Sequence, residues 1–199
     1  MAKIIPSENG SRKDVITQKA TTLFRKKGFP ATSMREIAEA IGVEAPSLYN
    51  HISSKNDILK DICFRVAKQY MGNLRAEELK NDSILAKIER IIRFHITMMV
   101  DEYETVYIAD HEWRHLPEPF LADFKSQRRS YRSRLAALIE EGIDRGEIRE
   151  VHPMIAVHTI LSAINGIDSW QRSGKKIDPV LLEDNMTQML ILGLQKKGR

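Results

Sequence analysis

Residues 32–51 read TSMREIAEAIGVEAPSLYNH, and this stretch decides the fold of the first part of the chain. Apolar residues recur at helical spacing over residues 34–40 and again over residues 45–50. Between the two segments stands Gly42, which permits a tight turn because it carries no Cβ. The stretch therefore predicts two short helices joined by a turn, which is the arrangement of a helix-turn-helix.

Serine caps mark the helix starts around this stretch. Ser33 is followed three residues later by Glu36, so the hydroxyl and the carboxylate can each accept a hydrogen bond from a backbone N–H at the helix start. The same spacing recurs at Ser11 with Asp14 and at Ser54 with Asp57. It predicts one helix over about residues 12–27 before the motif and another that starts near residue 54 after it.

The rest of the chain shows helical spacing and no clear strand signal. The expected helices cover about residues 84–99, 104–115 and 118–145, and two more open at Pro153 and at Pro179, the first of them extending past Ile167. We therefore expect an all-α protein of about nine helices, with a three-helix helix-turn-helix domain followed by a larger C-terminal helical bundle. The predicted domains are residues 1–56 and residues 57–199.

The composition excludes several classes of protein. No apolar run in the 199 residues approaches the length of a membrane span, and no secretory signal is expected at the N-terminus. Cys63 is the single cysteine, so no disulfide can form within the chain, and a cytoplasmic location fits. There is no phosphate-cradling glycine loop, nucleophile elbow or cysteine pair. We therefore expect no catalytic residue, no cofactor and no metal.

The positive charge lies in the first third of the chain. Residues 1–60 hold ten Lys and Arg against six Asp and Glu, a net charge of +4, and the remaining 139 residues hold 21 charges of each sign. A basic module on a neutral body favours a polyanion as partner of that module. A chance excess of a few charges is the alternative interpretation of this pattern alone.

The side chains of the motif suit DNA. The second short helix begins with small side chains, which let a helix enter the major groove closely. Tyr49 and His51 can reach phosphates, Thr32 and Ser33 offer donors at a positive helix end, and Lys55 adds charge. The predicted DNA contacts are Thr32, Ser33, Arg35, Ala45, Pro46, Ser47, Tyr49, Asn50, His51 and Lys55.

Residues 12–60 resemble the DNA-binding domain of the TetR family of bacterial repressors. Two departures from the usual family pattern are Ile52, where a phenylalanine is common, and Pro46, where a small residue or glycine is common. The matching residues are Ala20, Leu23, Phe24, Gly28, Thr32, Ile37, Ala38, Gly42, Val43, Leu48, Tyr49, His51, Ile52, Lys55 and Leu59.

The resemblance implies a homodimer that reads a palindromic operator in double-stranded DNA, a small-molecule effector and no membrane. Residues 1–56 then bind DNA, and residues 57–199 bind the effector and dimerise. The last two long helices are expected to form the dimer interface through Ile160, Ala163, Ile164, Ile167, Met186, Met189 and Leu190. The same stripes can instead be buried within one chain, an alternative that the sequence leaves open.

The body of the chain is similar, more loosely, to a TetR subgroup that controls fatty-acid, aromatic-acid and steroid catabolism and responds to acyl-coenzyme A thioesters. The matching features are residues 112–116, Arg129, Tyr131, Gly142, Gly146, Asn165 and Trp170. An acyl chain needs an apolar slot and its coenzyme A head needs cations, which Arg128, Arg129, Arg132 and Arg134 can supply. The predicted effector contacts are Met98, Met99, Tyr103, Tyr107, Trp113, Arg114, Phe120, Phe124, Arg128, Asn165 and Trp170.

Two alternatives to an effector-responsive repressor remain from the sequence. His111-Glu112-Trp113-Arg114-His115 has the H-E-x-x-H pattern that places two zinc ligands on one helix face in metallohydrolases, although Pro117 interrupts a helix directly after it. The second alternative is a DNA-binding protein without an effector. We expect the regulator, and no enzyme.

Overall fold

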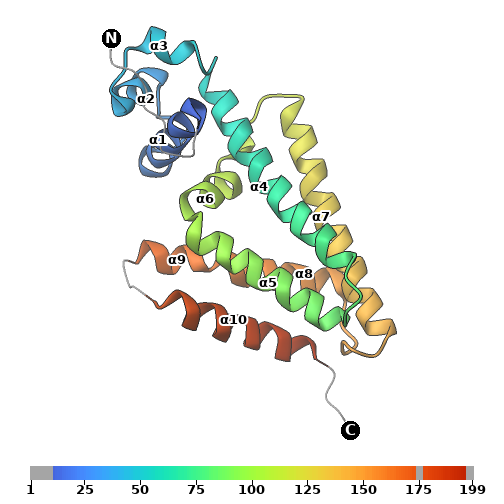
Figure 1. The fold of residues 1–199 in the computed structure, drawn as a ribbon. Coiled ribbons are helices and arrows are strands. Elements are labelled where there is room, and N and C mark those ends of the chain that lie inside the picture. The colour runs from blue at the N-terminus through green and yellow to red at the C-terminus, as the bar shows by residue number, and fades with distance from the viewer. Residues whose placement is uncertain (1–10, 174–176, 196–199) are drawn as a thin grey trace. The chain divides into compact units, whose positions relative to one another are not determined.

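The computed structural model describes residues 11–173 and 177–195, which form helices and short connections (Figure 1). Within these residues the helices are α1 Arg12–Lys27, α2 Met34–Ile41, α3 Ala45–Tyr49, α4 Lys55–Glu78, α5 Ile84–Asp101, α6 Tyr103–His111, the 3-10 helix η1 Trp113–His115, α7 Phe120–Asp144, α8 Pro153–Asn165, α9 Ile167–Arg172 and α10 Pro179–Leu194. The described residues contain no strand, only one isolated bridge between Ile148 and Gln195. The all-α prediction is confirmed.

The described helices number ten where about nine were expected. The predicted helix from Pro153 divides at Gly166 into α8 and α9. The predicted helix over residues 104–115 ends as α6 at His111 and continues as the separate turn η1. None of the helices in the described ranges has the length and apolarity to cross a membrane.

The chain divides into two compact units. The first takes the described residues up to Val66 together with Glu104–Lys125, and the second takes Ala67–Tyr103 together with the described residues from Ser126 onward. The boundaries thus fall inside α4, after Tyr103 at the start of α6, and inside α7. The predicted division between residues 56 and 57 separates functions rather than compact units, and it stays a prediction. The outer ends of the two predicted domains, residues 1–10 and 196–199, lie outside the described residues.

Helices α1, α2 and α3 share one small core in the first unit. The predicted capping boxes form at Ser11 and at Ser33, and α1 ends at Gly28, whose φ of 85° suits a residue without a Cβ. Phe24, Ile37 and Leu48, one from each helix, are essentially fully buried. Each such side chain contributes about 1.5–3 kcal/mol when it is removed from water, so this core fixes how α2 and α3 are held.

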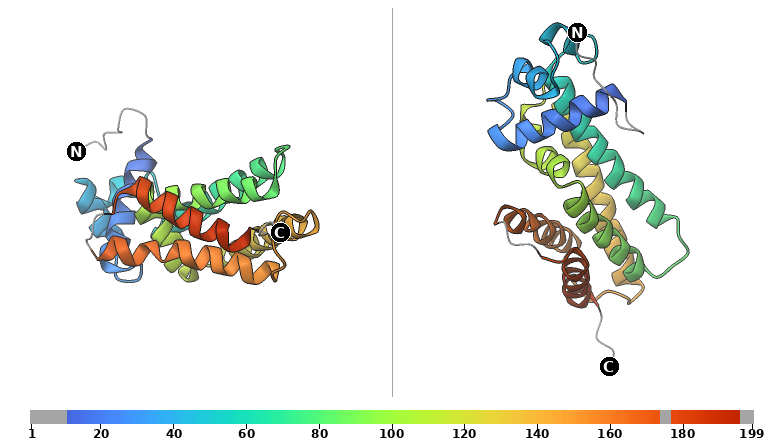
Figure 2. Two further views of the ribbon diagram at one scale, coloured as in Figure 1. Left: turned by 90° about the horizontal axis from the view of Figure 1, so that it is seen from below. Right: turned by 60° about the vertical axis from the view of Figure 1, so that its left-hand side comes forward.

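The second unit is built on α5, which contacts both α8 and α10. Figure 2 shows α8 and α10 lying side by side in both of its views. Arg93 of α5 binds Glu183 and Asp184 of α10 at 2.9 and 2.8 Å. These hydrogen bonds raise the pKa of Arg93, Asp184 contributing most, so the guanidinium stays charged and ties the two helices together.

A polar pair lies inside the second unit. Nε2 of His95 on α5 is 2.6 Å from the Tyr131 hydroxyl on α7, and the imidazole stacks on the Tyr70 ring of α4 with centroids 4.0 Å apart. Burial lowers the pKa of His95 to about 3, so the imidazole is neutral at physiological pH. Burial also raises the pKa of Tyr131, which keeps its hydroxyl protonated.

Candidate nucleic-acid interface

Helices α2 and α3 form the predicted helix-turn-helix. Gly42 ends α2 in the left-handed conformation, with φ 78°, and its N–H donates to the carbonyls of the last turn. Leu48 anchors α3 in the core, while Pro46, Tyr49 and Asn50 are exposed and Tyr49 keeps 52% of its surface. The outer face of α3 therefore presents small side chains beside one tyrosine, which suits close approach to base edges.

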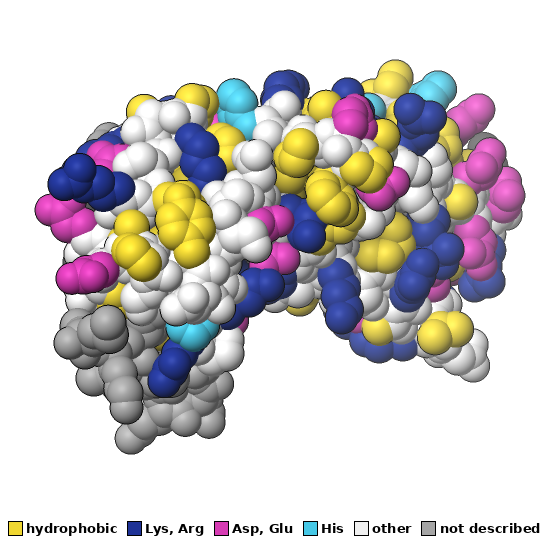
Figure 3. Space-filling model, turned by 90° about the horizontal axis from the view of Figure 1, so that it is seen from above, with side chains coloured by type: hydrophobic (Ala, Val, Ile, Leu, Met, Phe, Trp, Pro, Cys, Tyr) yellow, Lys and Arg dark blue, Asp and Glu magenta, His cyan; other side chains and the backbone are white. Residues whose placement is uncertain are grey.

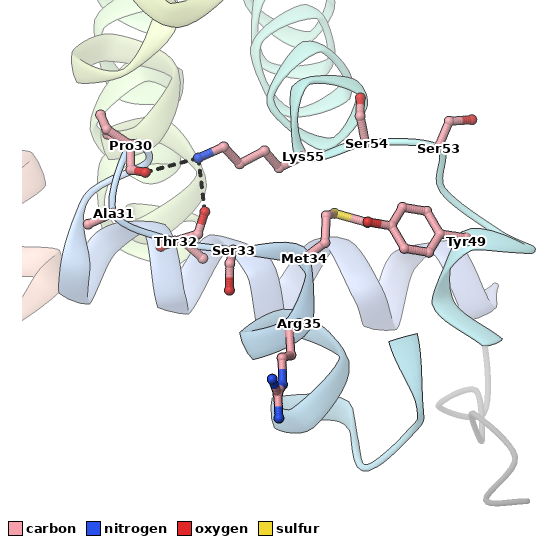
Figure 4. Close-up of a pocket in the computed structure, with 10 residues that line it drawn as sticks. All are labelled: Pro30, Ala31, Thr32, Ser33, Met34, Arg35, Tyr49, Ser53, Ser54 and Lys55. Atoms are coloured by element: carbon pink, nitrogen blue, oxygen red, sulfur yellow. Dashed lines mark hydrogen bonds between the residues drawn. The ribbon is translucent and has the colours of Figure 1, made fainter. Parts of the chain in front are cut away.

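A surface hollow of about 550 Å³ lies next to these helices and is drawn in Figure 4. It is open to solvent between the start of α2 and the start of α4, and the Met34 and Tyr49 side chains point toward each other across it. Its lining residues are Pro30, Ala31, Thr32, Ser33, Met34, Arg35, Tyr49, Ser53, Ser54 and Lys55. Five of the ten predicted DNA contacts thus gather around one hollow.

The start of α2 is the positive end of an eight-residue helix. The Ser33 hydroxyl accepts from the Glu36 N–H at 3.3 Å, and Glu36 accepts from the Ser33 N–H at 2.8 Å. The Lys27 ammonium, 2.6 Å from Glu36, is the main reason why the pKa of Glu36 falls to about 2. The capping box formed by Ser33 and Glu36 leaves the N–H groups of Met34 and Arg35 without an acceptor inside the helix. These two N–H groups can therefore donate to an anion.

Three of the predicted phosphate donors are already engaged within the chain. The Thr32 side chain is buried and its hydroxyl donates to the Gly28 carbonyl at 2.9 Å. The Ser33 hydroxyl donates to Glu36. The Lys55 ammonium donates to backbone carbonyls of the turn between α1 and α2. A donor already satisfied inside the chain gains less from a phosphate, and direct contact of these three side chains with DNA stays a prediction.

The excess positive charge of the first third is partly neutralised within the chain. Lys13 binds Asp61 at 2.5 Å and Lys27 binds Glu36 at 2.6 Å, whereas Arg35 is exposed on α2. Figure 3 shows Lys and Arg interspersed with Asp, Glu and apolar side chains on the face that it presents. Affinity for a polyanion would therefore rest on a few placed donors rather than on one large basic patch.

Five predicted effector residues belong to the first unit. Trp113 lies 6.1 Å from the buried Phe124 ring, and the Arg114 guanidinium lies 4.5 Å from the Trp113 centroid. Tyr107 stacks on His111 and lies under the Arg25 guanidinium at 4.1 Å. The fifth, Phe120, meets Phe64 edge-on.

The other six predicted effector residues belong to the second unit. Met98 and Met99 are buried on α5, and the Tyr103 hydroxyl donates to Asp168 at 2.6 Å. The sixth, Arg128, is half-buried on α7. Asn165 and Trp170 are exposed, and Trp170 keeps 40% of its surface. The predicted set thus falls into two groups, one in each unit.

The arginines of α7 differ in their partners. Arg134 pairs with Glu78, so it is neutralised within the chain. Burial lowers the pKa of Arg132, and the charges of Arg128 and Arg129 lower it further. Like charges on one helix face repel, and an anion beside them would relieve that repulsion.

The predicted dimer residues separate into buried and exposed ones. Ile160, Ile164 and Ile167 are each at most 3% exposed in the single chain, so they have almost no surface left for a second copy. Met189 is 75% exposed. The remaining predicted residues, Ala163, Met186 and Leu190, are half-buried. Sequence reasoning missed other exposed apolar side chains of α8 and α10, namely Ile155, Val180, Leu181 and Leu192.

The H-E-x-x-H residues do not share one helical face. His111 is the last residue of α6, and its Nδ1 lies 2.9 Å from the Tyr107 carbonyl oxygen. His115 belongs to η1 and stacks on Phe29 at 5.5 Å. Among the described residues, no three His, Cys, Asp or Glu side chains come together as a metal site would require. The local structure therefore gives the zinc-hydrolase alternative no support.

Comparison with protein-family models matches both parts of the chain. Residues 16–62 match the bacterial regulatory proteins of the tetR family, and residues 81–194, more than half of the chain, match the tetracyclin repressor-like C-terminal domain. The repressor KstR2 of Mycolicibacterium smegmatis is 26% identical over 75% of this chain and 73% of its own. The fatty acid metabolism regulator of Bacillus subtilis is 21% identical over 92% of this chain and 95% of its own.

Solved structures share the fold over nearly the whole chain. KstR2 of Mycobacterium tuberculosis superposes with a TM-score of 0.86, at 18% identity, over 98% of this chain and all of its own. AibR, solved in complex with isovaleryl coenzyme A and operator DNA, gives 0.79 at 22% identity, over 91% of this chain and 98% of its own. With a helix-turn-helix in the first unit and family matches to both parts of the chain, this protein belongs to the tetR family of bacterial regulatory proteins.

Proposed function

We propose that this protein is a homodimeric transcriptional repressor that binds a palindromic operator and leaves it when a small molecule binds the body. The observation that carries the proposal is the outer face of α3, with small side chains and Tyr49, beside the anion-accepting start of α2. Family membership and relatives named as repressors support it. Such a protein acts in the cytoplasm, where the chromosome lies, and regulates rather than catalyses.

The dimer would form on the exposed apolar face of α8 and α10. Ile155, Leu181, Met189 and Leu192 each keep more than half of their surface in the single chain. Apolar side chains gathered on neighbouring helices favour a protein partner, and a two-fold axis would pair each face with its own copy. Two subunits would then place two copies of α3 on the two halves of a palindrome.

The effector would be an acyl-coenzyme A thioester. AibR, which shares the fold, binds isovaleryl coenzyme A in its solved complex, and a further relative is named as a fatty acid metabolism regulator. In this chain, Arg132 with Arg128 and Arg129 would attract the phosphates of the coenzyme A head, and predicted apolar residues such as Met98 would receive the acyl chain. The ligand would favour the conformation with lower affinity for DNA.

The test begins with a genomic binding-site map of the protein, which should yield one palindromic sequence. Fluorescence anisotropy with that duplex should then show tight binding that weakens as salt increases. Isovaleryl, octanoyl and longer acyl-coenzyme A thioesters should release the duplex, whereas free coenzyme A and the free acids should not. Specific binding that no thioester weakens would leave an effector-free DNA-binding protein, and a map without a shared sequence would refute the proposed function.

A further inference from the structure

We infer that Arg149, in the connection between α7 and α8, is a positioning residue for the dimer because it holds the last turn of α10. The inference rests on the proposed function, since dimer affinity is its main consequence. The proposed dimer face consists of exposed apolar side chains on α8 and α10, and Arg149 belongs to neither helix. Two hydrogen bonds to the end of α10, together with the neighbours that fix Arg149, carry the inference.

The end of α10 depends on donors from outside the helix. The last four carbonyls of an α-helix have no donor within it, and at the end of α10 the Gln195 N–H serves the Ile191 carbonyl at 2.9 Å. Arg149 serves two others: its backbone N–H lies 2.9 Å from the Leu194 oxygen, and its Nε lies 2.5 Å from the Gly193 oxygen. A guanidinium also suits this place because the carboxyl end of a helix is its negative end.

The residue before Arg149 fixes it on α7. Ile148 is 1% exposed, and its side chain lies over Gly142, where an added Cβ would lie 2.5 Å from the Ile148 Cδ1. The Ile148 N–H donates to the Gly142 carbonyl at 3.0 Å. An isolated antiparallel bridge pairs Ile148 with Gln195, directly after α10. Because Ile148 is packed and bridged, the Arg149 backbone has little freedom to follow the end of α10 if that helix end moves.

Glu147 ties the same connection to a third helix. Its backbone N–H donates to the Gly142 carbonyl at 2.9 Å, and its carboxylate accepts from the Leu85 N–H, in the first turn of α5, at 3.1 Å. That N–H is one of the donors that a helix start leaves without a partner. Figure 1 shows the start of α5, the end of α7 and the end of α10 at the same end of the second unit. Residues 147–149 therefore hold three helix ends together.

The last two turns of α10 carry part of the proposed dimer face. Met189 and Leu192 keep 75% and 67% of their surface in the single chain, whereas Leu194, in the same turn as Leu192, is buried. A helix end frays when its terminal groups lack partners. Loss of the Arg149 side chain would therefore loosen the turn that presents Leu192 to the second copy, and dimerisation would have to order that turn first.

The test compares wild type, R149M, R149K and R145M by sedimentation equilibrium with fluorescence detection, over nanomolar to micromolar protein. Arg145 is an exposed arginine that pairs with Glu141 at the end of α7, so R145M measures the loss of one surface charge alone. We expect R149M to raise the dimer dissociation constant about tenfold, as the loss of one charged hydrogen bond predicts. R149K, which keeps a charged donor, should recover most of that loss, and R145M should stay within about twofold of wild type. A wild-type dissociation constant in R149M would overturn the inference.

Double-mutant cycles show whether Arg149 acts through the last turn of α10. Leu192→Ala removes an exposed apolar side chain from that turn, and Ile155→Ala removes one from α8. A positioning role predicts that R149M weakens the L192A dimer clearly less than the wild-type dimer, while the I155A dimer keeps the full effect of about tenfold. An arginine that touches the second copy directly would give the full effect in both backgrounds, and that result would count against a positioning role.

Hydrogen exchange followed by mass spectrometry observes the helix end itself. With wild type and R149M at concentrations where both are fully dimeric, the amides of residues 190–195 should exchange about tenfold faster in R149M, and those of α5 should exchange at the wild-type rate. Equal exchange at residues 190–195 would refute the role of Arg149. A wild-type chain that is monomeric at micromolar concentration would refute the proposed dimer, and faster exchange in its R149M variant would still show that Arg149 holds α10.

Discussion

Gly142 on α7 gives a quantitative test of the packing in the second unit. A Cβ built at this position would lie 2.5 Å from Cδ1 of Ile148 and 2.9 Å from Cγ2 of Ile84, and both isoleucines are buried. Overpacking of this kind costs about 1–3 kcal/mol, and contacts so short favour the upper part of that range. Alanine regains about 1 kcal/mol of helix propensity. We therefore expect Gly142→Ala to lower the free energy of unfolding by about 1–2 kcal/mol.

Gly72 on α4 provides the matched control, because it also lies inside a helix and a Cβ there would meet nothing within 4 Å. Gly72→Ala should stabilise by up to about 1 kcal/mol. At roughly 2–4 °C per kcal/mol for a chain of this size, the two melting temperatures should differ by about 2–12 °C. Circular dichroism at one fixed protein concentration measures the difference, since a dimer melts in a concentration-dependent way. Equal stability of the two variants would refute the packing argument.

Three further predictions concern single groups. His95 has a folded pKa of about 3 against 6.5 when unfolded, so the unfolded state binds the extra proton and stability falls as pH drops below 6.5. Chemical denaturation from pH 7 to 5 should show this loss, at up to about 1.4 kcal/mol per pH unit, and His95→Gln should flatten it. Tyr131→Phe leaves the buried imidazole without its partner and should cost about 1–3 kcal/mol in urea unfolding at pH 7.5, whereas a cost near zero would contradict the buried hydrogen bond. Met189→Asp introduces charge into the exposed apolar face of α10 and should shift sedimentation toward the monomer, which an unchanged dimer at micromolar concentration would disprove.

Helices α1, α2 and α3 of the first unit could be predicted closely from the sequence. Local signals determine them: the serine caps, the glycines after α1 and α2, and the apolar spacing, of which Phe24, Ile37 and Leu48 form the core. The roles of the polar residues could not be predicted in the same way. The Lys55 ammonium contacts backbone carbonyls of residues that stand 23 to 26 positions earlier in the chain. Local sequence patterns do not show that these residues lie next to Lys55 in the fold.

The second unit shows a different limit of sequence reasoning. Helix α8 is apolar on more than one side, so helical spacing alone cannot tell the face toward the core from the face toward a partner. The structure assigns Ile160 and Ile164 to the core and leaves Ile155 outside. The zinc pattern of the first unit fails for a related reason, because five consecutive residues do not specify that the helix ends at His111.

The Arg93 ion pairs have a consequence for how two effector molecules would act on one dimer. Arg93 binds α5, inside the second unit, to α10, which carries much of the exposed apolar face. In the proposed dimer, a ligand that displaces α5 in one subunit would therefore also displace α10, which packs against the other subunit. The second molecule would then bind with a different affinity from the first, and the dose-response curve for operator release would have a Hill coefficient different from one.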